Sequence, residues 1–90
     1  MNINKKPSFF RQIKKITDPA LMAQLEQAIL SVINAQSPKD IPELKKMKGY
    51  KSGIFYRIKI GNYRIGVTIE NDTITFVAFG RRKDFYKFFP

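Results

Sequence analysis

The 90-residue sequence contains no cysteine and no histidine. Without cysteine the chain can form neither a disulfide nor a thiolate metal site. Without histidine it lacks the side chain that most often serves as a general base or a metal ligand. Acid–base chemistry must therefore use lysine, arginine, tyrosine or carboxylates, and we expect no metal ion and no cofactor.

Long hydrophobic runs are also absent. The first ten residues, MNINKKPSFF, contain no apolar segment of the kind that directs secretion. No stretch approaches the roughly 18 apolar residues of a membrane-spanning helix. We therefore expect a cytoplasmic protein with neither a signal peptide nor a membrane span. Because repeats, low-complexity tracts and linkers are lacking too, one domain, residues 1–90, is expected.

Acidic residues are scarce, with 7 against 17 lysines and arginines and a formal net charge of +10. The excess is uneven: residues 1–43 carry a net charge of +2 and residues 44–90 carry +8. A field of this sign attracts polyanions, and nucleic acid is the first candidate. The alternatives are a solubilising lysine-rich surface and a basic face that meets an acidic protein.

The N-terminal half is predicted to be mainly helical. Residues 2–6 fit a short edge strand, and Ser8 is a candidate N-cap for a helix over residues 9–16. Asp18, followed by proline, is typical of a helix N-terminus. An amphipathic helix is predicted over residues 20–35. Its apolar side is formed by Leu21, Leu25, Ile29 and Val32.

From residue 55 onward the hydrophobic pattern has a period of two, after a connector over residues 38–49. Two-residue turns, Gly-Asn and Asn-Asp, separate three predicted strands. The strands cover residues 55–60, 63–70 and 73–80. The sequence thus predicts an α+β fold of two layers, with an N-terminal helical hairpin packed on a twisted antiparallel sheet.

The two short turns fix the register of the predicted meander. Lys59 then lies opposite Arg64, and Ile65 lies opposite Ala78. Side chains alternate across a sheet, so the two faces separate. The face beneath the helices collects Ile58, Ile60, Ile65, Val67, Ile69, Ile74, Phe76 and Ala78. The other face collects Arg57, Lys59, Arg64, Gly66, Thr68, Thr75, Val77 and Phe79.

Three cations share this second face, namely Arg57, Lys59 and Arg64, and no strand carboxylate accompanies them. Like charges opposite one another destabilise a sheet by up to about 1 kcal/mol. The patch therefore indicates a preorganised anion site, although the long side chains can also spread into water at little cost. Gly66 beside the patch would let a ligand or a backbone approach closely.

The chain leaves the third strand through more cations interleaved with aromatic residues, GRRKDFYKFFP. Arginine forms paired hydrogen bonds with phosphate, and aromatic rings stack on unpaired bases. We expect core packing for at least two of Phe85, Phe88 and Phe89. Arg82 and Tyr86 are instead candidates for RNA contact.

Residues 44–89 resemble the RelE/ParE superfamily of toxins from type II toxin–antitoxin systems. The similarity is carried by the hairpin YRIKIGNYRI, the strand TITFVAF and the ending RRKDFYKFF. It implies a ribosome-dependent mRNA endonuclease that inhibits translation, with mRNA on the ribosome as substrate and an acidic cognate antitoxin as partner. One alternative is a ParE-like inhibitor of DNA gyrase without nuclease activity. A non-toxic nucleic-acid-binding module is another.

The resemblance also implies roles for individual residues. The catalytic set would be Arg57, Lys59, Arg64, Arg82 and Tyr86. The charge pattern, and not the resemblance, indicates the RNA-binding set, which lies in the basic stretches before and after the three strands: Lys45, Lys46, Lys48, Lys51, Arg81, Lys83 and Lys87. The expected chemistry is attack of the 2′-hydroxyl on the adjacent phosphate, with arginines holding the phosphate and Lys59 or Tyr86 moving a proton. Many relatives have His-Arg where this chain has Arg81-Arg82, and Arg57 replaces a lysine of the family, so the general base stays open.

Overall fold

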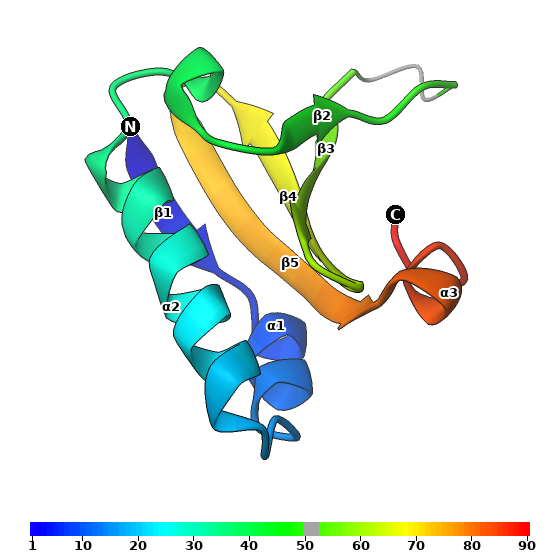
Figure 1. Ribbon diagram of the computed structural model, residues 1–90. Helices are drawn as coiled ribbons and strands as arrows, with labels where there is room; N and C mark the ends of the chain where they lie inside the picture. Colours follow the sequence, from blue (N-terminus) through cyan, green and yellow to red (C-terminus); the bar gives the residue numbers. More distant parts are fainter. Residues whose placement is uncertain (50–52) are drawn as a thin grey trace.

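The computed structural model describes residues 1–49 and 53–90. A five-stranded sheet with the order β1-β5-β4-β3-β2 is flanked by helices (Figure 1). The strands are β1 (Asn2–Lys5), β2 (Leu44–Lys46), β3 (Phe55–Ile60), β4 (Tyr63–Glu70) and β5 (Thr73–Arg81). The helices are α1 (Pro7–Ile13), α2 (Pro19–Asn34), the 3-10 turn η1 (Pro38–Asp40) and α3 (Arg82–Phe85). The predicted α+β class is confirmed, and in the described part of the chain no helix is long and apolar enough to cross a membrane.

The N-terminal helices begin at prolines. The N-cap of α1 is Lys6, so the prediction that Ser8 caps this helix is wrong. Ser8 lies inside the first turn instead, where its hydroxyl donates to the carbonyl of Val77 at 2.6 Å and ties α1 to β5. For α2 the prediction is confirmed, because the Asp18 carboxylate accepts the backbone N–H of Ala20 at 2.9 Å.

Both edges of the sheet extend beyond the predicted meander. At one edge, β1 pairs with β5 in parallel, so the sheet is mixed and not wholly antiparallel. At the other edge, β2 pairs with β3 in antiparallel fashion. The sequence pattern missed β2, which lies in the predicted connector 38–49, because three residues show too little alternation to indicate a strand.

The first hairpin has the predicted register, with Lys59 opposite Arg64. The second turn is formed by Asn71 and Asp72, whose φ angles of 50° and 60° suit a two-residue hairpin. The predicted strand bounds of β3 and β4 are confirmed as well.

A β-bulge in β5 changes which side chains reach the core. Val67 lies opposite Phe76 as predicted, but the register then shifts, and Ile65 lies opposite Phe79 where Ala78 was predicted. A bulge adds a residue to one strand and moves the side chains beyond it to the other face. Phe79 therefore belongs to the main core, and Ala78 lies in a second apolar cluster.

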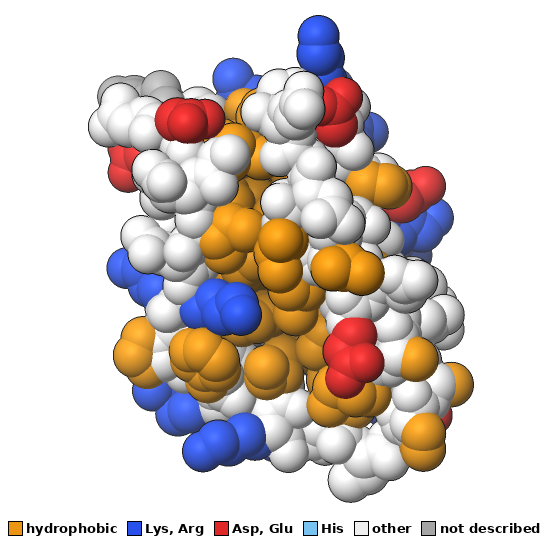
Figure 2. Space-filling view, turned by 90° about the vertical axis from the view of Figure 1, so that its left-hand side faces the viewer, with side chains coloured by type: hydrophobic (Ala, Val, Ile, Leu, Met, Phe, Trp, Pro, Cys, Tyr) orange, Lys and Arg blue, Asp and Glu red, His pale blue; other side chains and the backbone are white. Residues whose placement is uncertain are grey.

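The main core lies between the sheet and helices α1 and α2. Phe9 and Phe76 are completely buried, with ring centroids 5.2 Å apart. Tyr63 stacks on Phe79 with centroids 5.3 Å apart. Viewed from the side of the molecule that carries α2 and β1, apolar side chains form a band down the middle of the surface (Figure 2).

The second cluster is built by the C-terminal segment on the opposite face of the sheet. Phe85 and Phe89 are buried there together with Ala78. A Cβ atom at Gly66 would lie only 2.7 Å from Cγ of Phe89. Gly66 therefore makes room for the Phe89 ring, whereas the sequence suggested the close approach of a ligand or a backbone.

Replacing Gly66 with alanine is expected to lower the free energy of unfolding by about 1–3 kcal/mol, because the added methyl group overlaps the Phe89 ring. Urea denaturation followed by circular dichroism measures this change. In a Phe89→Ala background the same substitution should cost much less. An equal cost in both backgrounds would show that the close approach of Phe89 is not the cause.

Candidate nucleic-acid interface

Two neighbouring hollows lie along the C-terminal segment, one beside β2 and β3 and the other beside the β3–β4 turn. One, of about 430 Å³, is lined by Lys45, Lys46, Met47, Lys48, Arg57 and Tyr86. The other, of about 580 Å³, is lined by Asn62, Arg81, Arg82, Lys83 and Tyr86. Because Tyr86 lines both, we treat the two hollows as one surface, the basic groove. Among the described residues, no aspartate or glutamate lines it.

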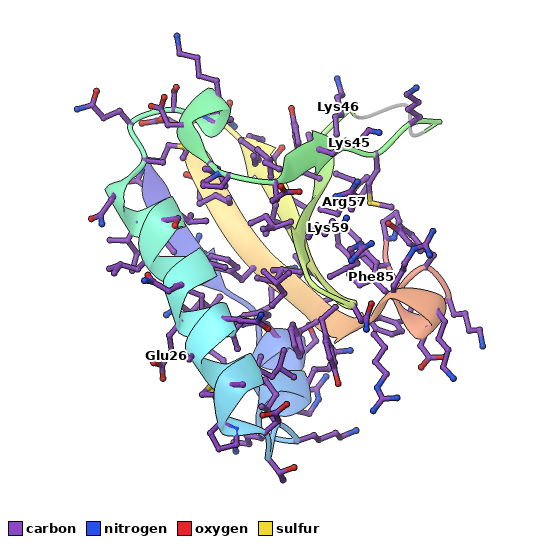
Figure 3. All side chains as sticks on the ribbon, in the orientation of Figure 1. Glu26, Lys45, Lys46, Arg57, Lys59 and Phe85 are labelled. Carbon is purple, nitrogen blue, oxygen red and sulfur yellow. The ribbon has the colours of Figure 1, made fainter. Side chains whose placement is uncertain are left out.

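Strands β2 and β3 provide one wall of the basic groove. On this wall Lys45 lies directly opposite Arg57. Lys59 lies directly opposite Arg64 in the neighbouring strand pair, but neither of these two side chains lines the groove. The missed strand β2 thus adds a second pair of facing cations to the one that the sequence predicted. Figure 3 shows Arg57 and Lys59 on β3, on the side of the strand that faces the C-terminal segment. Lys45 and Arg57 repel each other, so this wall is electrostatically prepared for an anion.

The C-terminal segment provides the other wall. The backbone N–H of Arg82 donates to the carbonyl of Asn62 at 2.8 Å, so the β3–β4 turn holds the first residue of α3. Phe85 is completely buried and meets the ring of Tyr86 edge-on, with centroids 5.1 Å apart. The buried Phe85 ring thus holds one side of Tyr86 in place, while about half of Tyr86 stays exposed.

Arg64 does not line the basic groove in the described structure. Its side chain is only 6% exposed, and its Nη1 donates to the carbonyls of Gly61 at 3.0 Å and Tyr63 at 2.9 Å. Its Nε is buried and has no hydrogen-bond partner within the described residues. Arg64 therefore stabilises the β3–β4 turn in this conformation, and direct contact with a phosphate requires its side chain to turn outward.

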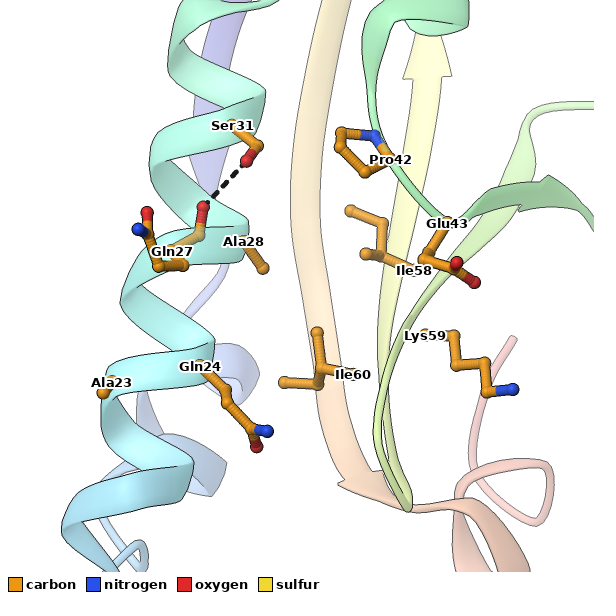
Figure 4. Close-up of a pocket in the computed structure, with 10 residues that line it drawn as sticks. All are labelled: Ala23, Gln24, Gln27, Ala28, Ser31, Pro42, Glu43, Ile58, Lys59 and Ile60. Atoms are coloured by element: carbon orange, nitrogen blue, oxygen red, sulfur yellow. Dashed lines mark hydrogen bonds between the residues drawn. The ribbon is translucent and has the colours of Figure 1, made fainter.

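The remaining predicted residues lie in different places. Lys59 is exposed, its side chain points away from α2, and it borders the hollow between α2 and β3 and not the basic groove (Figure 4). Arg81 lines the groove, and its Nε donates to the Tyr63 hydroxyl at 3.3 Å. Lys87 is exposed and pairs with Asp84 at 3.6 Å. Lys51 falls outside the described residues.

Sequence reasoning missed Asn62 and Met47 as groove residues. A signal for Asn62 was present, because the predicted turn lies at the end of the sheet where the chain leaves β5. Tyr63 pairs with Arg81, which brings the turn beside the start of α3. No comparable signal exists for Met47, because it follows the short strand β2 that the pattern did not reveal.

A separate, apolar hollow of about 430 Å³ lies between α2 and β3 (Figure 4). Small side chains on α2, Ala28 and Ser31 among them, face Ile58 and Ile60 across it. This surface lies on the helical side of the sheet, whereas the basic groove lies beside the C-terminal segment.

Comparison with known proteins identifies several relatives. The family described as "ParE toxin of type II toxin-antitoxin system, parDE" matches residues 3–86. Toxin RelE3 of Methanocaldococcus jannaschii is 45% identical over 58 residues, which cover 63% of this chain and 64% of that protein. The chain thus matches slightly less than two thirds of the length of this curated relative.

Solved structures are similar over nearly the whole chain. A RelB–RelE antitoxin–toxin complex from Methanococcus jannaschii contains a chain with a TM-score of 0.78 and 31% identity, covering 97% of this chain and 99% of that one. YafQ from E. coli strain BL21(DE3) gives a TM-score of 0.70 at 10% identity, covering 91% and 93%. At that identity the likeness to YafQ concerns the fold alone.

Proposed function

The chain belongs to the RelE/ParE superfamily of type II toxins, and from this premise we propose that it is a ribosome-dependent endoribonuclease that cleaves mRNA and inhibits translation. The observation that carries the proposal is the basic groove, whose described lining includes seven lysines and arginines and one phenol but no carboxylate. A polyanion with unpaired bases suits this lining, because cations meet its phosphates and the phenol ring meets a base. The proposed substrate, mRNA on the ribosome, would place the activity in the cytoplasm.

The groove supplies groups for each part of the proposed reaction. Cleavage by the 2′-hydroxyl of the RNA needs in-line alignment, neutralisation of the charged transition state and proton transfer. Arg57 from β3 and Arg82 from α3 would hold the scissile phosphate from opposite walls. Tyr86 between them would stack on a base or exchange a proton. The products would be a 2′,3′-cyclic phosphate and a 5′-hydroxyl.

The weakness of the proton carriers fits a dependence on the ribosome. The chain has no histidine, so Lys59 and Tyr86 remain the candidates to move a proton. Proton transfer typically contributes about 10²- to 10⁴-fold to a rate, so a site with a poor base still gains from alignment and charge. The ribosome would supply the alignment by holding the mRNA in a fixed conformation.

Two observations favour this function over inhibition of DNA gyrase. The matching family description names ParE, but the relatives at 45% and 31% identity bear the RelE name. In addition, a protein that acts only by binding gyrase does not need a groove whose arginines and phenol can bind a phosphate and a base.

We also propose an acidic antitoxin as the partner. Its carboxylates would neutralise the basic groove, and apolar side chains of a helix or an extended segment would fill the hollow between α2 and β3 (Figure 4). Leu30 and Ile33 add two exposed apolar side chains to α2, outside the residues that line this hollow. The solved RelB–RelE complex shows that a similar chain is bound by an antitoxin.

The proposal is tested by incubating the purified protein with ribosomes that translate a defined mRNA. Primer extension is expected to reveal new 5′ ends within the reading frame, and none when the same RNA is free of ribosomes. An Arg57→Ala, Arg82→Ala double variant purified in parallel controls for contaminating nucleases. Intact mRNA together with loss of gyrase supercoiling activity would overturn the proposal. Equal cleavage of free RNA would retain the nuclease but remove the ribosome dependence.

A further inference from the structure

Besides the two hollows of the basic groove and the apolar one beside α2, another hollow of about 570 Å³ lies at the end of the sheet between the α1–α2 turn and the C-terminal segment. It is called the third hollow because it adjoins the two hollows of the groove. Arg81 lines this hollow and also the basic groove. Tyr86 borders both parts of the groove, and Arg81 borders both the groove and the third hollow, so the three hollows are neighbours on the surface. A single strand bound in the groove would thus pass close to the third hollow.

The lining of the third hollow differs from that of the groove. Lys15 and Arg81 are accompanied here by the carboxylates of Asp18 and Asp84. The Oε1 of Gln12 accepts the backbone N–H of Phe79 at 2.7 Å. The side-chain NH₂ of Gln12 then provides donors to the hollow. A phosphate would be repelled by two carboxylates, whereas the edge of a base carries both donors and acceptors and matches a lining of mixed sign.

An aromatic ring borders the same hollow. Phe88 is 43% exposed, and the Cζ end of its ring points at Gly80, where a Cβ atom would be only 2.8 Å from Cζ. Phe85 supports the Phe88 ring edge-on, with centroids 5.9 Å apart. The ring is thus held by backbone and core while part of its surface faces solvent, which is the arrangement of a preorganised stacking platform.

Arg81 is held in place as well. Besides the contact of its Nε with the Tyr63 hydroxyl, its guanidinium lies 5.9 Å from the centre of the Tyr63 ring. Tyr63 is in turn stacked on buried Phe79. The guanidinium is therefore positioned at the junction between the groove and the third hollow.

We propose that the third hollow is a base pocket, which binds one unpaired base of the RNA next to the phosphate held in the basic groove. Phe88 provides the stacking surface, and Arg81 spans the pocket and the groove. The inference rests on the proposed endoribonuclease function and adds a subsite that would contribute to the choice of cleavage site.

The test combines Phe88→Ala with removal of single bases from the mRNA. An abasic nucleotide is placed in turn at each position flanking the scissile phosphate, and kcat/KM for cleavage on the ribosome is measured. At one position kcat/KM of the wild-type protein is expected to fall by roughly 5- to 150-fold, the range for loss of a base–aromatic stack. Phe88→Ala should lose a similar factor on intact mRNA and be indifferent to the abasic nucleotide at that position.

Further variants separate stacking from folding. Phe88→Leu keeps an apolar side chain over Gly80 without an aromatic face, and should show the same loss as Phe88→Ala. Phe10→Ala removes another partly exposed ring, on α1, and should respond to abasic nucleotides as the wild type does. Equal sensitivity of wild type and Phe88→Ala at every position would overturn the base pocket while cleavage itself upholds the nuclease. Absence of cleavage by the wild type would overturn the proposed function and the pocket together.

Discussion

Replacing Arg82 with alanine is expected to slow RNA cleavage on the ribosome by about 100-fold or more, the usual cost of removing one group that stabilises transition-state charge. The Arg82 side chain is exposed and lines the basic groove beside Tyr86. Its backbone N–H, and not its guanidinium, makes the hydrogen bond to Asn62 that holds the start of α3. The free energy of unfolding should therefore stay within about 0.5 kcal/mol of the wild-type value. Single-turnover cleavage rates on preformed ribosome–mRNA complexes measure the effect.

A matched control removes the same charge elsewhere. Arg11 is exposed on α1, away from the residues that line the basic groove, and Arg11→Ala should leave cleavage nearly unchanged. Arg82→Lys keeps the charge but loses the paired hydrogen bonds of the guanidinium, so an intermediate rate is expected. Equal slowing by Arg82→Ala and Arg11→Ala would mean that only the overall positive field matters, and the assignment of Arg82 to the phosphate would be wrong.

The parts of the fold that the sequence predicted are those with local signals. The alternation of side chains and the two-residue turns determined the bounds of β3 and β4 and the pairing of Lys59 with Arg64. The bulge in β5 has no such signal. Val77, Ala78 and Phe79 are all apolar, so either register places an apolar residue in the core, and only packing against Tyr63 and the C-terminal segment decides between them.

The candidate site likewise contains residues that the sequence predicted and residues whose placement it could not predict. Arg57, Arg82 and Tyr86 were predicted together, and the structure places all three along one groove. The burial of Arg64 was not predictable, because it depends on how the side chain folds back on the carbonyls of its own turn. The role of Gly66 was not predictable either, because it depends on the tertiary packing of Phe89, which is far from Gly66 in the sequence.

The C-terminal segment links stability to the site. Facing cations on β2 and β3 repel each other, and this cost falls on the face that lacks the helices. Phe85 and Phe89 bury apolar surface on that face and so offset the repulsion. The same segment carries Arg82 and Tyr86, so the cluster that stabilises the sheet also places one wall of the groove.

Replacing Phe85 with alanine is therefore expected to lower the free energy of unfolding by about 3–5 kcal/mol, a large share of the 5–15 kcal/mol typical of a small domain. Phe85 is completely buried, and its ring contacts Tyr86, Phe88 and Phe89 with centroids 5.1, 5.9 and 5.2 Å away. Urea denaturation followed by circular dichroism measures the loss. Cleavage should fall as well, even at a temperature where the variant stays folded, because Tyr86 loses the ring that anchors it.

Two further variants decide whether this loss comes from the C-terminal cluster. Phe85→Leu retains most of the apolar volume and should recover a large part of the stability. Phe10→Ala removes a ring that is 45% exposed on α1, so it should cost far less. If Phe85→Ala lowers the free energy of unfolding by no more than Phe10→Ala does, the C-terminal segment does not unfold together with the sheet. The wall that carries Arg82 and Tyr86 would then be free to detach from β4 and β5 without unfolding the rest, and the groove would not be preorganised for RNA.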